Sequence, residues 1–367
     1  MKNFSKKRKK ILVALSGGVD SSVAAKLLKE QRYNVLGVYF IFTKQIWKSN
    51  FQVKKIAKKL GIPLKIIDVR KQFKKRVIDY FLNAYRNGQT PNPCVVCNKE
   101  IKFRLLFDLM KKEKADFIST GHYARIKVRP FPSSTFYRRI SQGPALFKAK
   151  DKTKDQSYFL YRLNQRDLAK IVFPLGNYKK SEVKKIAKKV NLPVAENESQ
   201  DICFLANQDI NYYLSKYIKP KPGDVVDKKG NVLGKHKGLS FYTIGQRKGI
   251  EIGGTGPYWV MEKNIQKNEL VVTNNSKELF TKKFQINETN WIKQKLKFPL
   301  RAEVQIRYRA KKVSAIIRKM GKERWEVRSK KPLRAVTAGQ SAVFYKKGEV
   351  LGGGTIDSIV RNANIKN

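Results

Sequence analysis

The segment SGGVDSS, residues 16–22, combines the residue types that hold phosphate groups in proteins. Its glycines, Gly17 and Gly18, allow the backbone to approach a ligand closely, and backbone N–H groups at the start of a following helix attract anions. The segment lacks the lysine of a GxxxxGK[ST] loop, which disfavours kinase or GTPase chemistry. Asp20 is a candidate for positioning a metal ion on the phosphates. The alternative interpretation is an ordinary glycine-rich turn capped by Asp or Ser.

A second chemical feature is TPNPCVVCNKEIKF, residues 90–103, which contains Cys94 and Cys97. A helix is expected over the residues that follow Cys97, which places this thiol near a helix N-terminus and beside Lys99 and Lys102. A helix N-terminus and neighbouring lysines both lower the pKa of a thiol. The segment therefore predicts a reactive thiolate at Cys97.

The third cysteine, Cys203, lies in the polar stretch SQDICFLA. Three cysteines are too few, and odd in number, for a disulfide framework. This indicates that the protein works in a reducing cytosol. A structural zinc site would need four ligands, and besides the cysteines the chain offers only His122 and His236, with no second CxxC pair. The simplest alternative for Cys203 is a small buried apolar residue.

The chain of 367 residues carries 80 Lys and Arg against 28 Asp and Glu, a formal net charge of +52. A basic excess of this size favours a polyanionic partner, above all nucleic acid. Part of the excess can be compositional, because Lys, Asn and Ile are all abundant, as expected of an AT-rich genome. No run of about 18 apolar residues predicts a membrane span, and the apolar run at residues 11–15 is too short for a signal peptide.

Strands alternate with helices in the first half of the chain, which predicts a parallel α/β sheet. Strands are expected at residues 11–15, 34–42, 64–69 and within 115–123. Helices are expected at 22–31, at 53–61 and within 180–193, the last with Ser181 as N-cap and Pro193 beyond its end. Residues 129–147 are expected to form an irregular surface insertion. Hairpins are expected at 221–238, and an all-β barrel from about residue 270. We therefore expect three domains: an α/β domain that carries the glycine-rich turn (1–206), a small central domain (207–268) and a C-terminal β-barrel (269–367).

SGGxDS between a strand and a helix is the motif of the PP-loop ATP pyrophosphatases, which activate an oxygen by adenylation and release pyrophosphate. Over nearly its whole length the chain resembles the bacterial tRNA-specific 2-thiouridylase family. The segments that carry the resemblance, besides SGGVDSS, are TPNPCVVCNKEIKF, STGHYAR, KDQSYFL, ESQDICFL, FYTIGQRKG, IRYR and AGQSAVFY. The resemblance implies 2-thiolation of the wobble uridine of tRNA, with ATP, Mg²⁺ and a protein-bound persulfide.

The resemblance also implies roles for the cysteines. Cys203 carries the persulfide and Cys97 is its partner thiol, and a transient Cys97–Cys203 disulfide releases the sulfur by thiol exchange. Cys94 stands where some family members have Asp, so the role of this position as a base is open. One alternative is a [4Fe–4S] cluster on Cys94, Cys97 and Cys203 with one open iron. No metal site is otherwise expected.

Two sets of binding residues follow from the resemblance. The ATP site comprises Ala14, Leu15, Ser16, Gly17, Gly18, Val19, Asp20 and Ser21, with Phe40 at the adenine and Gly121 at the carboxyl edge of the sheet. The tRNA and its target base meet Asn92, Pro93, Cys94, His122, Lys154, Asp155, Gln156, Arg307, Tyr308 and Gln340. Core roles for Phe40 and His122 are the alternatives.

The partners expected are tRNA and a cysteine desulfurase or sulfur-relay protein, and the protein is expected to be a cytoplasmic monomer that does not bind membranes. Two other functions stay open at this point. A PP-loop amidating or ligase enzyme acting on a small molecule would need no paired thiols. A non-catalytic basic RNA-binding protein would need neither SGGVDSS nor a reactive Cys203.

Overall fold

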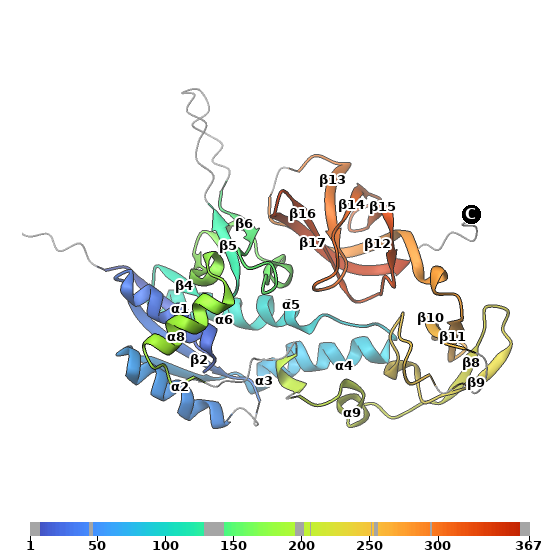
Figure 1. The fold of residues 1–367 in the computed structure, drawn as a ribbon, viewed down its shortest axis with the longest axis horizontal. Coiled ribbons are helices and arrows are strands. Elements are labelled where there is room, and N and C mark those ends of the chain that lie inside the picture. The colour runs from blue at the N-terminus through green and yellow to red at the C-terminus, as the bar shows by residue number, and fades with distance from the viewer. Residues whose placement is uncertain are drawn as a thin grey trace, which may run out of the picture.

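The computed structural model describes residues 8–43, 47–127, 143–194, 202–205, 207–250, 252, 256–293 and 296–359. Figure 1 shows an α/β unit at one end of the molecule, a barrel at the other, and a small sheet beneath the barrel. In this part of the chain no helix has both the length and the apolar character needed to cross a bilayer.

The α/β unit is built on five parallel strands in the order β3-β2-β1-β4-β7. They are β1 (Lys10–Ala14), β2 (Asn34–Ile41), β3 (Leu64–Asp68), β4 (Phe117–Ser119) and β7 (Ile171–Val172). The four predicted strands are confirmed, and β7, with two residues, is too short to show a pattern in the sequence. The strand order reverses between β1 and β4, and ligands of open α/β sheets bind at such a point.

Helices cover both faces of this sheet, because side chains alternate along a strand. In β1, Ile11 and Val13 belong to one core and Leu12 to the other. The first core is covered by α1 (Val19–Glu30), α2 (Trp47–Leu60) and α8 (Lys180–Lys189). The second is covered by α3 (Arg70–Phe73), α4 (Asp79–Arg86), α5 (Pro93–Cys97) and α6 (Arg104–Lys112), with π-helical turns at Lys74–Ile78 and Asn98–Phe103.

The start of α8 differs from the prediction, which placed Ser181 at the N-cap. The N-cap is Lys179, whose backbone N–H donates to the Glu182 carboxylate. The backbone N–H of Lys180 donates to Asp151 Oδ2 at 2.9 Å. Because these two carboxylates already satisfy the N–H groups, the helix begins before Ser181.

The central unit is a four-stranded sheet in the order β10-β11-β8-β9. Its strands are β8 (Gly223–Val226), β9 (Val232–His236), β10 (Trp259–Asn264) and β11 (Glu269–Thr273). The hairpin predicted within 221–238 is confirmed as β8 and β9. Strand β11 runs parallel to β8, so residues 269–273 belong to this sheet.

The C-terminal unit is a closed six-stranded barrel, as the sequence predicted. Its strands are β12 (Phe280–Trp291), β13 (Leu300–Gln305), β14 (Val313–Lys319), β15 (Trp325–Arg334), β16 (Ser341–Lys346) and β17 (Glu349–Ile359). β12 pairs with both β15 and β17, and this closes the barrel.

A hairpin from the α/β unit extends the barrel sheet. It consists of β5 (Ala124–Lys127) and β6 (Ala145–Lys148), and β6 meets β17 where Phe147 pairs with Glu349. The expected irregular insertion at 129–147 is therefore wrong for residues 145–147, because these residues pair as a strand. Residues 128–142 lie outside the described part of the chain.

Candidate active site

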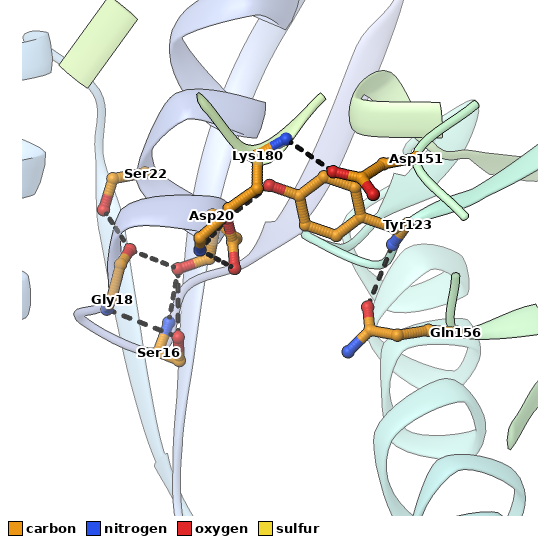
Figure 2. A network of polar contacts seen from close by, with 9 residues as sticks. Ser16, Gly18, Asp20, Ser22, Tyr123, Asp151, Gln156 and Lys180 are labelled. Atoms are coloured by element: carbon orange, nitrogen blue, oxygen red, sulfur yellow. Dashed lines mark hydrogen bonds and ion pairs between the residues drawn. The ribbon is translucent and has the colours of Figure 1, made fainter. Parts of the chain in front are cut away.

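The turn between β1 and α1, with the end of β1, forms the phosphate loop (residues 14–21). Gly17 has φ +85°, a left-handed conformation that favours glycine. The Ser16 N–H donates to Ser21 Oγ at 3.0 Å, and the Gly18 carbonyl accepts from the hydroxyls of Ser21 (3.2 Å) and Ser22 (2.9 Å) (Figure 2). No side chain among the described residues caps α1 at Gly18. The first N–H groups of α1 are thus available to an anion.

Asp20, in the first turn of α1, is held by two residues that the sequence did not single out. Lys180 Nζ lies 2.7 Å from each of its carboxylate oxygens, and the Tyr123 hydroxyl donates to Oδ1 at 2.8 Å (Figure 2). A metal ion on Asp20 would therefore compete with Lys180. Lys180 is one of 80 basic residues, so only the fold distinguishes it.

Gly121 brings the end of β4 against the phosphate loop. A Cβ atom at this position would lie 2.7 Å from the backbone N of Ser21 and 2.9 Å from the carbonyl carbon of Asp20. Only glycine permits this approach without a shift of α1. Phe40 is different, because its side chain is buried in the sheet core with its ring 6.1 Å from that of Phe42.

The three cysteines, which we call the thiol site, are all free thiols. Cys97 is the buried last residue of α5, and the helix begins at Pro93, since proline is favourable in the first turn. Burial raises the pKa of the Cys97 thiol to about 12, although the charge of Lys102 opposes this. The predicted low pKa at a helix N-terminus is therefore wrong, because the helix starts earlier and desolvation outweighs the lysine.

Cys203 is exposed, yet the protein packed around its thiol raises the pKa of that thiol. The adjacent Phe204 is buried, with ring centroids 5.1 Å from Phe81 and 6.0 Å from Phe73. Phe204 and Cys97 share one core. Burial is the largest influence on the pKa of Cys97. The charges of Cys203 and Cys94 also raise it, while Lys102 lowers it, so both other thiols lie within electrostatic reach of Cys97.

The thiols do not form a metal site in this conformation. Throughout the described residues, which include every cysteine, no three His, Cys, Asp or Glu side chains gather closely enough to hold a metal ion. Neither the zinc nor the cluster interpretation has support from this geometry.

His122 lies in the chain between Gly121 and Tyr123, and its ring packs on Phe103, which belongs to the same core as Cys97. It is buried, with its ring stacked on Phe103 at 6.0 Å and its Nδ1 2.7 Å from Thr120 Oγ1. Burial, with a smaller contribution from the charge of Lys102, lowers the pKa of His122 to about 3. His122 is therefore a neutral imidazole at physiological pH.

Two expected tRNA residues lie where residues 90–92 meet residues 338–341, a contact that we call the seam. Gln340 Nε2 donates to the carbonyls of Thr90 (3.1 Å) and Pro91 (3.3 Å). Asn92 Nδ2 donates to Ser341 Oγ at 3.3 Å. In this structure Asn92 and Gln340 therefore join the α/β unit to the barrel and hold the segment that leads into Cys94.

The other expected tRNA segments also meet one another. Gln156 Oε1 accepts from the backbone N–H of Tyr123 at 2.9 Å, and Asp155 Oδ1 accepts from that of Ala149 at 3.0 Å. The ring of Tyr308 lies 4.5 Å from that of Phe159. The segments KDQSYFL and IRYR thus lie together beside the residues that hold Asp20.

A basic cleft of about 410 Å³ opens on the barrel. Its lining residues are Ile306, Arg307, Ala310, Lys311, Lys312, Val313, Ser314, Lys330, Lys331, Pro332, Leu333 and Arg334. Six of them are Lys or Arg and none is acidic, so the cleft suits a polyanion.

A parallel sheet with a phosphate loop at its switch point is the fold of PP-loop nucleotide-binding enzymes. Three family models match the chain: a tRNA methyl transferase HUP domain at 9–207, a tRNA methyl transferase PRC-barrel domain at 211–274 and an aminomethyltransferase beta-barrel domain at 281–356.

Curated relatives name the family. The tRNA-specific 2-thiouridylase MnmA of Carboxydothermus hydrogenoformans is 40% identical over 371 residues, covering 95% of this chain and 98% of that protein. That of Buchnera aphidicola subsp. Acyrthosiphon pisum is 42% identical over 375 residues, covering 96% and 98%. The chain belongs to the tRNA-specific 2-thiouridylase family. The solved structures are more distant. A 4-thiouridine synthetase–RNA complex with bound ATP has a TM-score of 0.34 and 19% sequence identity, and the match covers 57% of this chain and 50% of that one. This likeness adds nothing to the family assignment.

Proposed function

We propose that the protein transfers sulfur to C2 of the wobble uridine of tRNA in a reaction driven by ATP. The observation that carries the proposal is the short segment Gly121–His122–Tyr123. It contacts the phosphate loop through Gly121 and Tyr123, and reaches the surroundings of the thiols through His122. Membership of the family supports tRNA as the substrate.

ATP would be bound at the phosphate loop. The uncapped start of α1, the left-handed Gly17 and the close approach of Gly121 together leave backbone N–H groups for its phosphates. Asp20 would exchange Lys180 for Mg²⁺, and Lys180 would then be free to pair with a phosphate oxygen. ATP supplies the adenylyl group that turns the uridine O2 into a leaving group, with release of pyrophosphate.

The thiols would supply the sulfur. Cys203 is exposed, which suits loading of a persulfide by a cysteine desulfurase or a sulfur-relay protein. The thiolate of Cys97 would attack the Cys203 sulfur of the persulfide. The Cys97–Cys203 bond forms, the outer S–S bond breaks, and the outer sulfur leaves as hydrosulfide with the electron pair. Hydrosulfide would then displace AMP at C2 of the uridine.

The tRNA would contact both ends of the molecule. Residues 1–206 would carry the chemistry. The central domain would extend from 207 to β11, which belongs to its sheet, and the barrel that follows would bind tRNA through the basic cleft. Arg307 and Tyr308 suit phosphate pairing and base stacking. The target base would be enclosed by Asn92, Pro93, Cys94 and the neutral His122, and residues 154–156 would lie beside these four.

Two alternatives have less support. A cluster on the three cysteines would require them to move, because they do not form a metal site here. An amidating reaction on a small molecule would leave Cys97 and Cys203 without a role.

The nucleotide products test this proposal. With ATP, unmodified tRNA and a sulfur source, we expect AMP and pyrophosphate in equal amounts. ADP and phosphate would contradict adenylation. The Cys203→Ser protein is the matched control, because it should bind ATP and tRNA like the wild type while forming no thiolated tRNA.

A further inference from the structure

We propose that Lys102 is the positioning cation of the sulfur-transfer step, with its ammonium group stabilising the sulfur anions on Cys97 and Cys203. The inference rests on the proposed function and deepens it, because it adds a residue that the two-thiol mechanism does not itself name. Three observations support it: the helical geometry around Lys102, the absence of a competing carboxylate, and the set of groups that its charge reaches.

The helical geometry turns Lys102 toward Cys97. Lys102 follows Cys97 by five positions, and the chain between them is the π-helical turn Asn98–Phe103. In an α-helix of 3.6 residues per turn, a residue five positions on lies about 140° around the axis. In a π-helical turn, whose hydrogen bonds run from i to i+5, that residue returns to nearly the same face. Such turns occur mostly as single insertions, frequently at functional sites.

No carboxylate of the described residues neutralises Lys102, which is half-buried. The nearest candidate in the chain, Glu100, pairs with Arg76 at 3.0 Å and with Arg104 at 3.5 Å. Lys99, the other lysine of this segment, exerts its charge on Asp167, where it opposes the effect of burial. The charge of Lys102 is thus available for an anion that forms during the reaction.

The charge of Lys102 reaches the thiols and the histidine together. Burial is the largest influence on the pKa of Cys97, of Cys203 and of His122, and the charge of Lys102 is the second for all three. The other groups that act on the pKa of Cys97 are the thiols of Cys203 and Cys94, and both raise it. The arginines and Glu100 on the packed elements already neutralise one another in part.

Such a cation answers a chemical need of the exchange step. A thiol with a pKa of about 12 is ionised in roughly one molecule in ten thousand at pH 8. Without a nearby positive charge, the attacking thiolate of Cys97 would be rarer still. The same charge would stabilise hydrosulfide as it leaves, because both anions are held within one site.

The test is the pH dependence of thiol alkylation in the full-length protein, with iodoacetamide as the probe and the modified peptides resolved by mass spectrometry. In Lys102→Met we expect the profiles of Cys97 and Cys203 to move to higher pH, with alkylation at pH 8 slower by roughly tenfold, which is a pKa change of about one unit. Lys102→Arg should restore most of the rate, because it keeps the charge. Lys99→Met is the matched control and should leave the profiles unchanged.

An unchanged profile in Lys102→Met, or equal effects of Lys99→Met and Lys102→Met, would overturn the inference. If Lys102→Met does not fold, Lys102→Gln provides the same neutral test with a polar side chain. Alkylation requires no tRNA, so its outcome is separate from that of the proposed function. A shifted profile in a protein that does not thiolate tRNA would keep the role of Lys102 at the thiols and contradict the proposed function alone.

Discussion

The phosphate loop and the thiol site are built in opposite ways. The loop consists of consecutive residues, and its bonds from Ser16 to Ser21 and from Gly18 to Ser22 are local. The thiol site joins Cys97 to a residue 106 positions away, and depends on burial of Phe204 in the same core as Cys97. A local site can form as soon as its strand and helix form. A long-range site depends on the packing of the whole α/β unit.

The two sites also differ in how their reactive groups meet solvent. Asp20 is paired on both oxygens before any ligand binds. The thiol site combines a buried sulfur with an exposed one. This asymmetry suits sulfur transfer, because the exposed thiol can be loaded by a partner protein while the buried thiol is kept from other oxidants.

The largest effect that would sharpen this comparison is expected at the thiol site. Cys97→Ser and Cys203→Ser should each abolish thiolation while ATP and tRNA still bind, since neither side chain belongs to the phosphate loop. Cys94→Ser should keep most of the activity and is the control. Nucleoside analysis of tRNA under anaerobic conditions is the measurement, and complete loss of activity in Cys94→Ser with loss of an iron–sulfur absorbance would favour a cluster instead.

At the phosphate loop, Asp20→Ala should lower the rate of pyrophosphate release by roughly 100-fold, the usual cost of removing one group that stabilises developing charge. The fold should persist, because Asp20 is only partly buried. Tyr123→Phe, which removes one donor to Asp20 and keeps the ring, should have a much smaller effect. Equal losses in both variants would mean that the pairing of Asp20, and not its carboxylate, supports the reaction.

Gly121→Ala tests whether the loop depends on the approach of β4. The added Cβ would lie 2.7 Å from Ser21 N, so the free energy of unfolding should fall by about 1–3 kcal/mol, and ATP affinity should fall with it. Gly321→Ala is the control, because a Cβ there meets nothing within 4 Å. Thermal unfolding and ATP titration measure both effects, and wild-type behaviour of Gly121→Ala would contradict the packing argument.

His122 predicts a pH dependence of stability. Its pKa is about 3 in the folded protein against 6.5 for the free group, so between these values the unfolded state binds a proton that the folded state does not. Stability therefore rises with pH in this window, and the His122 contribution should fall by roughly 2 kcal/mol from pH 7 to pH 5. In His122→Asn this part of the dependence should disappear. The test is denaturant unfolding of the wild type and of His122→Asn at pH 7 and at pH 5. The change in unfolding free energy between the two pH values is then compared between the two proteins.

The smallest expected effect is at the basic cleft. Arg307→Gln should reduce the slope of log affinity against log salt by roughly 0.7 to 0.9, the value for one phosphate contact. Arg318→Gln removes the same charge from an exposed position outside the cleft and should change the slope less. Equal slopes in the two variants would show that the barrel contributes only its overall charge.

The sequence revealed local features more reliably than distant ones. The strand, turn and helix around SGGVDSS could be predicted because glycine, serine and the apolar run have local conformational meanings. The four longer parallel strands were predicted from their apolar runs, and the barrel from the alternation of apolar and polar residues. The N-cap of α8 was predicted two residues too late, because the N–H groups of Lys179 and Lys180 are satisfied by Glu182 and by Asp151, and Asp151 is remote in sequence.

The environment of the thiols could not be predicted from spacing alone. Cys97 was expected near a helix N-terminus, but Pro93 begins the helix earlier and the core buries the thiol. Lys180 and Tyr123 were not singled out as partners of Asp20, because nothing in their neighbourhoods in the sequence separates them from other lysines and tyrosines. The side-chain position of Phe40 was left open by the sequence, and the structure places it in the core.

The central claim is that ATP drives transfer of sulfur from Cys203 to a tRNA uridine. The most direct measurement uses cysteine labelled at sulfur and a cysteine desulfurase as the sulfur source. tRNA is incubated with this source and with either the wild-type or the Cys203→Ser protein, and the label is then measured in its nucleosides. The proposed mechanism predicts labelled 2-thiouridine only with wild-type protein and ATP, and one AMP for each thiouridine formed. Labelled 2-thiouridine made by Cys203→Ser, or formed without ATP, would contradict it.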